Sequence, residues 1–321
     1  MTESSSPRGL IALLKTTFSG FTEDNCMQMA AALSYYTAFS IAPLLMLVIL
    51  LAGTVFGQEA IEGTLSSQLT DILGPTTAEL LQTMLAQVRH KTSGGIGLAT
   101  LAGLVGMFLG ATGLFGQIQD ALNRIWRVGP DPDQGGLAAM LTKRLFSFLA
   151  IALVSSLLLA SLLLSTFVAA LGAMADSTLP IAVPQGLWWG VDLLVSLGLT
   201  TALFTILFKV LPDARLHWKD AIIGALFTTL LFSLGKLALG RYLGGGSIGS
   251  AFGAAGALAL ILAWVYYTSM IVLLGAQFTR AWVRSQGRIV QPRAGAVKFV
   301  VSRTVLRDEP AEPSPSKSHP H

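Results

Sequence analysis

Long apolar runs with almost no charged residues alternate with short polar segments along most of this chain. A helix of about 20 apolar residues crosses the hydrocarbon core of a bilayer, and these runs are long enough to do so. The pattern therefore predicts an all-α fold, a polytopic transmembrane helical bundle. Its six predicted spans cover residues 30–56, 96–116, 145–171, 187–210, 220–240 and 251–276.

These spans divide the chain into three parts. Residues 1–29 form an N-terminal amphipathic segment, residues 30–279 form the six-helix transmembrane domain, and residues 280–321 form a tail. The tail begins basic and ends in a Pro/Ser-rich stretch, a composition that predicts disorder.

Two segments outside the spans are predicted to form amphipathic helices. In the N-terminal segment, the residues that share one helical face are Leu10, Leu13, Leu14, Thr17 and Phe18. Such a short helix is expected to lie on the membrane surface. The long loop 57–95 carries two apolar stripes, and Pro75 followed by Thr76 and Glu79 marks the start of its second helix.

Proline and glycine mark where the helices are expected to bend or pack closely. Pro43 lies in the middle of the first span, where it removes a backbone donor and favours a kink. Small residues spaced along one helix face let neighbouring backbones approach, within one chain or between copies in a homo-oligomer. The residues of this kind are Gly103, Gly106, Gly110 and Gly113 in the second span, and Gly249, Gly253 and Gly256 in the last. Gly245 lies in the turn before the last span and is a candidate hinge.

The glycines around this turn also match the spacing of a dinucleotide-binding motif. Gly244, Gly246 and Gly249 spell G-x-G-x-x-G. That motif needs a preceding strand and an acidic residue about 20 positions further on. Here an apolar helix precedes it, and no acidic residue occurs between Asp220 and Asp308. We therefore expect packing glycines and no nucleotide cofactor.

Composition and charge agree with a membrane protein and suggest its orientation. The chain is 53% hydrophobic and 12% charged, with a net charge of +4. If both termini lie inside, 17 of the 21 Lys and Arg residues fall on the cytoplasmic side, which the positive-inside rule favours. Both the N-terminal segment and the tail are then cytoplasmic. The same rule accounts for the basic excess without a nucleic-acid partner.

Ionisable and polar groups inside the spans are the candidate transport or substrate-binding residues, because a charge near the bilayer centre is costly unless it is paired. Asp192 and Lys236 are expected at similar depth near the outer side, where they either pair, line a cavity or extend to the interface. Tyr35, Tyr36 and Gln277 are the other candidates, although the tyrosines also suit interface anchors.

No catalytic or metal-binding arrangement stands out. Cys26 is the single cysteine, so neither a disulfide within the chain nor a cysteine-based metal site is expected. His217 with Asp213 and Asp220 makes an interfacial cluster or, more simply, a solvated loop. We expect neither an enzyme nor a bound cofactor.

Four stretches resemble the YihY/BrkB family of bacterial inner-membrane proteins, long labelled ribonuclease BN. They are "ALSYYTAFSIAPLL" (32–45), "ALNRIWRV" (121–128), the run from "LPDARLHWKD" to "RYL" (211–243) and "FGAAGALALILAWVYYTSMIVLLGAQF" (252–278). The resemblance implies residence in the inner membrane and, in some members, a link to envelope function or virulence. One departure stands out, since the family usually ends the last span in Leu-Gly-Ala-Glu and this chain has Gln277 there.

The expected function is to transport or bind an envelope-related substrate, such as a lipid or amphiphile, with the lipid bilayer as partner. A membrane-associated enzyme, as the ribonuclease label implies, is one alternative. Metal-dependent RNA cleavage needs convergent carboxylates or histidines, and the spacing of the residues assigns none. A structural partner in envelope assembly is the other alternative.

Overall fold

The structure is a computed structural model, and it describes residues 9–56, 83, 113–132, 185–243 and 247–300. This part of the chain is mostly helical. Its helices are α1 (Leu10–Glu23), α2 (Cys26–Phe56), α7 (Gln185–Val210), α8 (Trp218–Leu243) and α9 (Ser247–Ser285). Residues 113–126 are also helical.

Three of these helices are long and apolar enough to cross a membrane. The qualifying stretches are Leu193–Val210, Trp218–Ala238 and Leu258–Ser285. They overlap the predicted spans 187–210, 220–240 and 251–276, and the last stretch extends nine residues beyond its predicted span. The predicted first span lies within α2. The span 145–171, most of 96–116 and nearly all of the loop 57–95 lie outside the described residues, so the count of six spans stays a prediction.

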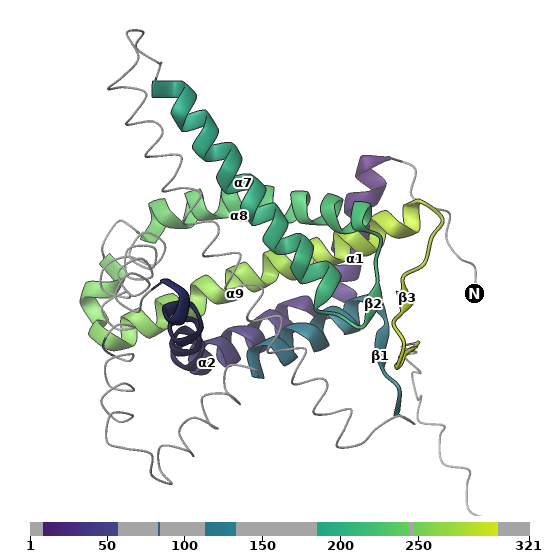
Figure 1. Ribbon diagram of the computed structural model, residues 1–321, viewed down its shortest axis with the longest axis horizontal. Helices are drawn as coiled ribbons and strands as arrows, with labels where there is room; N and C mark the ends of the chain where they lie inside the picture. The colour runs from purple at the N-terminus through teal and green to yellow at the C-terminus, as the bar shows by residue number, and fades with distance from the viewer. Residues whose placement is uncertain (1–8, 57–82, 84–112, 133–184, 244–246, 301–321) are drawn as a thin grey trace, which may run out of the picture.

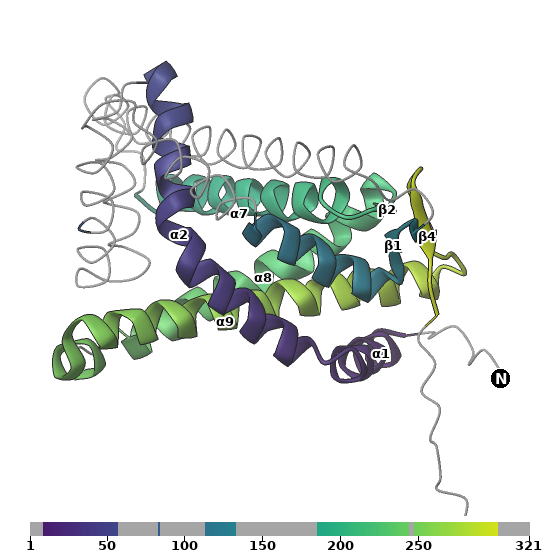
Figure 2. The ribbon, with the colours of Figure 1, turned by 90° about the horizontal axis from the view of Figure 1, so that it is seen from below.

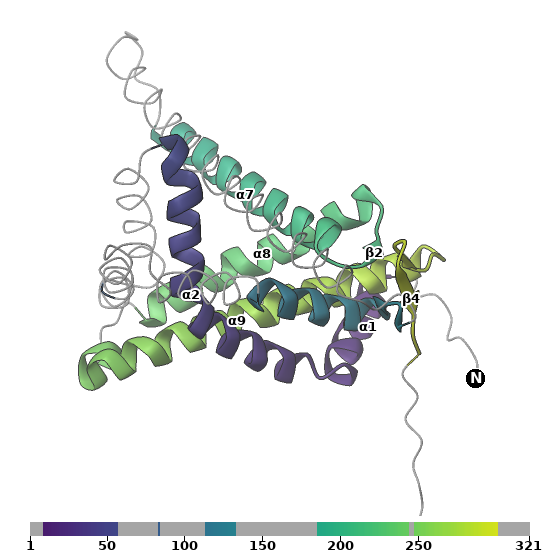
Figure 3. The same cartoon turned by 60° about the horizontal axis from the view of Figure 1, so that its bottom comes forward.

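Helix α9 is the centre of the described part of the fold. It packs against α1, α2 and α8, while α7 packs against α8. Figure 1 shows α8 and α9 running side by side. Helix α7 meets α8 near the short connection between them and separates from it toward its own N-terminal end (Figures 1 and 3).

Helix α2 changes direction part-way along its length (Figures 2 and 3). Pro43 lies near the middle of this 31-residue helix, and it cannot donate the intrahelical hydrogen bond of its position. The bend therefore agrees with the kink expected from the sequence.

The α8–α9 contact depends on two reciprocal pairs of glycine and threonine. A Cβ added at Gly224 would lie 1.9 Å from Thr279 Oγ1, and one added at Gly275 would lie 1.9 Å from Thr228 Oγ1. Each threonine hydroxyl donates to the carbonyl four residues earlier in its own helix. Glycine thus brings two membrane-length helices into close contact, as small residues do in bilayers.

The glycines singled out in the sequence are mostly not placed by the structure. Gly103, Gly106, Gly110 and Gly245 lie outside the described residues. Gly249, Gly253 and Gly256 belong to α9, but nothing of their packing is described. Gly113 is described, and a Cβ there would meet no atom of the described chain within 4 Å.

Four short strands add to the expected all-helical fold. They are β1 (Val128–Pro130), β2 (Ala214–Arg215), β3 (Gln291–Pro292) and β4 (Ala296–Lys298). They pair antiparallel as β1 with β4 and β2 with β3. The segment after α9 thereby pairs with two earlier parts of the chain, β1 and the α7–α8 connection that contains β2. All four strands lie at one end of the bundle (Figures 1 and 3).

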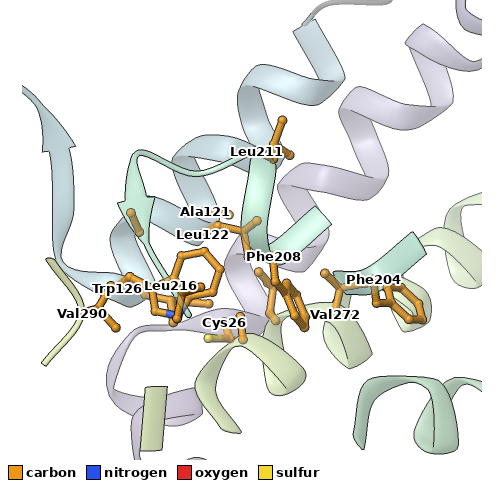
Figure 4. Close-up of a cluster of buried hydrophobic side chains, with 14 of the residues drawn as sticks. Cys26, Ala121, Leu122, Trp126, Phe204, Phe208, Leu211, Leu216, Val272 and Val290 are labelled. Carbon is orange, nitrogen blue, oxygen red and sulfur yellow. The ribbon is translucent and has the colours of Figure 1, made fainter. Parts of the chain in front are cut away.

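The same end holds the main buried apolar cluster of the described residues. Leu122, Ile125 and Phe208 are completely buried there, and the Trp126 ring meets Phe208 edge to face at 6.1 Å. Figure 4 shows Cys26 from the start of α2 in the same cluster as Val272 of α9. Trp126 is only 2% exposed and is therefore a core residue.

Candidate functional site

A buried carboxylate at this end of the bundle is the centre of the candidate site. Asp24 is 3% exposed and follows the last residue of α1. Its Oδ1 lies 2.5 Å from the Arg127 guanidinium, and its Oδ2 lies 3.2 Å from Arg280 Nη1. Gln277 Nε2 donates to the same Oδ2 at 2.7 Å. Three segments far apart in the sequence therefore meet on one side chain.

Backbone geometry at two corners positions this cluster. The Asp24 N–H closes α1 by donating to the Gly20 carbonyl, and Asn25 turns the chain into α2 with φ of 53°. Arg127 ends the helical segment 113–126 with φ of 58°. Such left-handed conformations are uncommon for residues other than glycine, and asparagine tolerates them best. Asp24 thus directly precedes one sharp turn of the chain, and Arg127 forms another.

Gln277 joins α9 to the end of α1. Its Nε2 donates to the Gly20 carbonyl at 3.0 Å as well as to Asp24, and it contacts Cys26 Sγ at 3.6 Å. Carbonyl and carboxylate oxygens are acceptors only, so these partners fix which end of the amide faces them. A Cβ added at Gly20 would lie 2.7 Å from Gln277 Oε1, and the close approach therefore requires glycine.

The thiol of Cys26 is part of this corner. Burial, as the largest cause, raises its pKa to about 11, while the hydrogen bond from Gln277 acts in the opposite direction. The thiol is therefore protonated at neutral pH, and a protonated, buried thiol is a poor nucleophile.

A cavity of about 350 Å³ opens directly beside the cluster, between α1 and α9, and is called the α1–α9 cavity below. Residues at helical spacing line it from both sides. Those of α1 are Lys15, Thr16, Ser19, Gly20 and Glu23, and those of α9 are Gln277, Arg280, Ala281 and Arg284.

Positive charge exceeds negative charge in this cavity. Lys15, Arg280 and Arg284 face one lining carboxylate, Glu23, which accepts a hydrogen bond from Ser19. Within the described part of the chain, Lys15 and Arg284 have no ion-pair partner, and Arg280 has only Asp24. Since Asp24 is shared with Arg127, the cavity wall keeps an uncompensated cationic surface.

A second buried network lies around Asp213. Its carboxylate accepts hydrogen bonds from Asn123 Nδ2 at 2.8 Å and Gln119 Nε2 at 3.1 Å, and its N–H donates to Asn123 Oδ1. The Arg293 N–H donates to the Asp213 carbonyl, and its guanidinium donates to the carbonyls that end α7. Burial lowers the pKa of Arg293. This network fastens the α7–α8 connection to its neighbours.

A third carboxylate forms a closed pair. Asp220 is 2% exposed, and Arg288 donates to its two oxygens at 2.7 Å each. This hydrogen bonding raises the pKa of Arg288. Of the two interpretations of His217, Asp213 and Asp220, the interfacial cluster does not form as one site. The His217 side chain is 78% exposed and lies 3.9 Å from Asp220, whereas Asp213 pairs elsewhere.

Of the residues singled out in the sequence, the structure brings only Gln277 into the cluster. Tyr35 and Tyr36 lie exposed on α2 and contact each other edge to face at 5.9 Å, as interface anchors would. Lys236 is exposed on α8, and Asp192 belongs to α7. The surroundings of the Asp192 side chain are not described, so their pairing stays a prediction.

Sequence reasoning did not find Asp24 as the centre of the site. Its partners Arg127 and Arg280 lie 103 and 256 positions away, and no local pattern connects them. The helical spacing of Arg280 and Arg284 after the last span was the available signal, together with the neutral residue at position 277.

Membrane-length helices joined at one end by buried, paired charges define a multi-helix membrane protein. The chain belongs to the BrkB family, since the family model described as "Virulence factor BrkB" matches residues 17–296. No solved structure matches the chain.

Three similar proteins carry the name UPF0761 membrane protein. The one from Azotobacter vinelandii is 28% identical over 283 residues, which cover 84% of this chain and 64% of the relative. The one from Alcanivorax borkumensis is 27% identical, with 82% and 58% covered. The one from Ralstonia nicotianae is 30% identical, with 79% and 55% covered. This chain thus spans about three fifths of the length of these relatives.

Proposed function

We propose that this protein binds an amphiphilic, envelope-related substrate at the α1–α9 cavity and moves it across or along the bacterial inner membrane. The observation that carries this proposal is the position of a polar, charged cavity against an apolar helix of membrane length. Helix α9 has 39 residues and is about 58 Å long at 1.5 Å per residue. The hydrocarbon core is about 30 Å thick, so α9 extends into the headgroup region.

The surface of α1 supports an amphiphile over a small soluble solute. Leu10, Ile11 and Phe18 are exposed on α1, while Leu13 and Thr17 of the same helix are buried. The buried face packs with Phe278 and Ala281 of α9. The helix that forms one wall of the cavity therefore also exposes apolar side chains, along which an acyl chain can lie while a polar headgroup occupies the cavity.

Purified full-length protein in liposomes tests this function. We expect faster uptake or transbilayer movement of a fluorescent phospholipid than in protein-free liposomes, and co-purifying lipid identified by mass spectrometry. Equal rates in both kinds of liposome together with no retained lipid would reject the proposal. A retained lipid with no movement would reduce the function to binding.

Two rival functions predict other outcomes. A membrane-bound nuclease predicts RNA cleavage by purified protein that is free of contaminating nuclease, and that cleavage should disappear with a variant of a buried acid. A structural assembly partner predicts a stable complex with another envelope protein and no effect on lipid movement. Among the described residues, no group of three or more His, Cys, Asp or Glu side chains is arranged to hold a metal ion.

The orientation with both termini in the cytoplasm belongs to the same proposal. It puts the Asp24 cluster and the α1–α9 cavity at the inner face of the membrane. A reporter that is active only in the periplasm, fused after residue 290, should give no signal. Activity of that fusion would overturn the orientation.

A further inference from the structure

We infer that the α1–α9 cavity is a binding site for a phosphate group, and that this group belongs to the headgroup of an anionic phospholipid. The inference deepens the proposed function, because it names the chemistry of the part of the amphiphile that the cavity holds. It depends on the charge, donor geometry and position of the cavity walls.

The arginines of the cavity have free donors. A guanidinium carries five N–H donors, and within the described residues the Arg280 side chain makes one hydrogen bond, from Nη1 to Asp24. Arg284 lies one helical turn further along α9 on the same face, and no partner is described for it. Two guanidiniums one turn apart can both reach the oxygens of one phosphate. Phosphate and carboxylate are the acceptors that arginine binds most strongly.

Helices α1 and α9 contribute cations to the cavity from opposite sides. Lys15 faces the arginines from α1, and an ammonium acts on a phosphate as a point charge. The cavity of about 350 Å³ is at the small end of the usual range for small-ligand pockets, so it suits a headgroup better than a whole lipid.

The Asp24 carboxylate does not neutralise the positive charges of the cavity wall. Arg127 lies closer to Asp24 than Arg280 does, at 2.5 Å against 3.2 Å. An anion at Arg280 can therefore share that guanidinium while Asp24 keeps Arg127 and Gln277. The buried cluster holds Arg280 in position, and the ligand completes its charge balance.

The two sources of a phosphate group predict different behaviour. A lipid headgroup predicts that the protein retains phosphatidylglycerol in neutral detergent in preference to phosphatidylcholine, which has a phosphate but no net charge. A soluble phosphate compound predicts binding of inorganic phosphate with no preference among lipids. Native mass spectrometry of the full chain with each probe measures both.

The decisive variants remove two cavity cations and two matched cations elsewhere. Lys15→Ala with Arg284→Ala removes charges of the cavity that make no described structural contact. Lys219→Ala with Lys298→Ala removes two exposed charges that do not line the α1–α9 cavity. Since each basic side chain strengthens binding to an anionic lipid surface, the cavity pair should weaken phosphatidylglycerol binding by about tenfold or more. The control pair should change it less than twofold, and Arg284→Lys should keep most of the binding.

The outcomes separate this inference from the proposed function. Equal loss in both variant pairs, or no loss in either, overturns the phosphate site even if lipid transport by the wild type is intact. Phosphatidylcholine bound as tightly as phosphatidylglycerol overturns the anionic headgroup. Binding of inorganic phosphate that the cavity pair abolishes, without any lipid binding, upholds the site and overturns the amphiphile. Matching unfolding midpoints in the two pairs show that folding is not the cause.

Discussion

Asp24 and Asp220 are both almost fully buried, and both pair with arginines near the C-terminal end of the described chain. Their charge balance differs. Asp220 meets one guanidinium, that of Arg288, through two hydrogen bonds of 2.7 Å. Asp24 meets two guanidiniums, from Arg127 and Arg280, and the adjacent cavity adds further cations.

This difference indicates that the Asp220 pair is structural, whereas the Asp24 cluster can form part of a binding site. A bidentate pair with matched charge has little capacity left for a ligand, and it holds the segment after α9 against the start of α8. A carboxylate that is outnumbered by guanidiniums orders their side chains without neutralising them. The surplus charge is then available to an anion at the protein surface.

Removing the Asp24 carboxylate should have the largest effect on stability. Asp24→Ala leaves Arg127 and Arg280 without an acidic partner in a largely buried place, and breaking a buried pair in this way costs about 3–5 kcal/mol. Denaturant unfolding in detergent measures it. Glu23→Ala is the matched control, since Glu23 is the neighbouring acid but is exposed, and it should stay within about 0.5 kcal/mol of wild type. Equal losses in the two variants would contradict the central role of Asp24.

Removing both charges of a pair, instead of the acid alone, should restore stability at the Asp220 pair but not at the Asp24 cluster. Asp220→Ala combined with Arg288→Ala should regain most of the stability that Asp220→Ala alone loses, because no unpaired charge is left behind. Asp24→Ala combined with Arg280→Ala should regain little, since Arg127 stays unpaired. The unfolding midpoints of singles and doubles give the two coupling energies. Similar recovery at both clusters would show that their charge balance does not differ.

A methyl group at Gly20 should loosen the Asp24 corner more mildly. The added Cβ would meet Gln277 Oε1 at 2.7 Å, so the amide must shift from its partners. After the gain in helix propensity from alanine, a net loss of about 1 kcal/mol is expected from the overpacking. Gly116→Ala, where a Cβ would meet no atom of the described chain within 4 Å, should be neutral or stabilising in the same assay.

The reactivity of Cys26 should change when the Asp24 cluster is broken and stay the same when the Asp220 pair is broken. Its buried thiol, with a pKa raised to about 11, should react with maleimide at background rate at neutral pH in the wild type. The rate should rise as pH increases toward the pKa, because only the thiolate reacts. Asp24→Ala should speed labelling at neutral pH, and Arg288→Ala should leave it slow. Fast labelling of folded wild type would show that this corner is open.

The helices could be predicted from the sequence because their signal is local. The spans 187–210 and 220–240 differ from α7 and α8 by at most three residues at each end. The predicted span 251–276 covers the apolar part of α9, but the helix itself continues to Ser285. The hydropathy pattern predicts a span only up to the first charged residues, whereas the backbone hydrogen bonds of the helix continue through Arg280 and Arg284.

The candidate site could be predicted only in part because its contacts are long-range. Gln277 was singled out as a neutral residue in an unexpected place, and it does contact the buried acid. Asp24 gave no such signal, because its burial depends on two arginines supplied by distant segments. The strands could not be predicted either. They are two or three residues long, and they exist only because the segment after α9 returns along two earlier connections.

The most direct test of the account compares lipid movement in liposomes that contain matched variants. Transbilayer movement of fluorescent phosphatidylglycerol is measured for wild type, for Lys15→Ala with Arg284→Ala, and for Lys219→Ala with Lys298→Ala, at equal protein content. The account predicts that the cavity pair falls to near the protein-free rate, while the control pair keeps the wild-type rate. Wild-type movement in the cavity pair would contradict the claim that the cationic α1–α9 cavity is where the substrate binds.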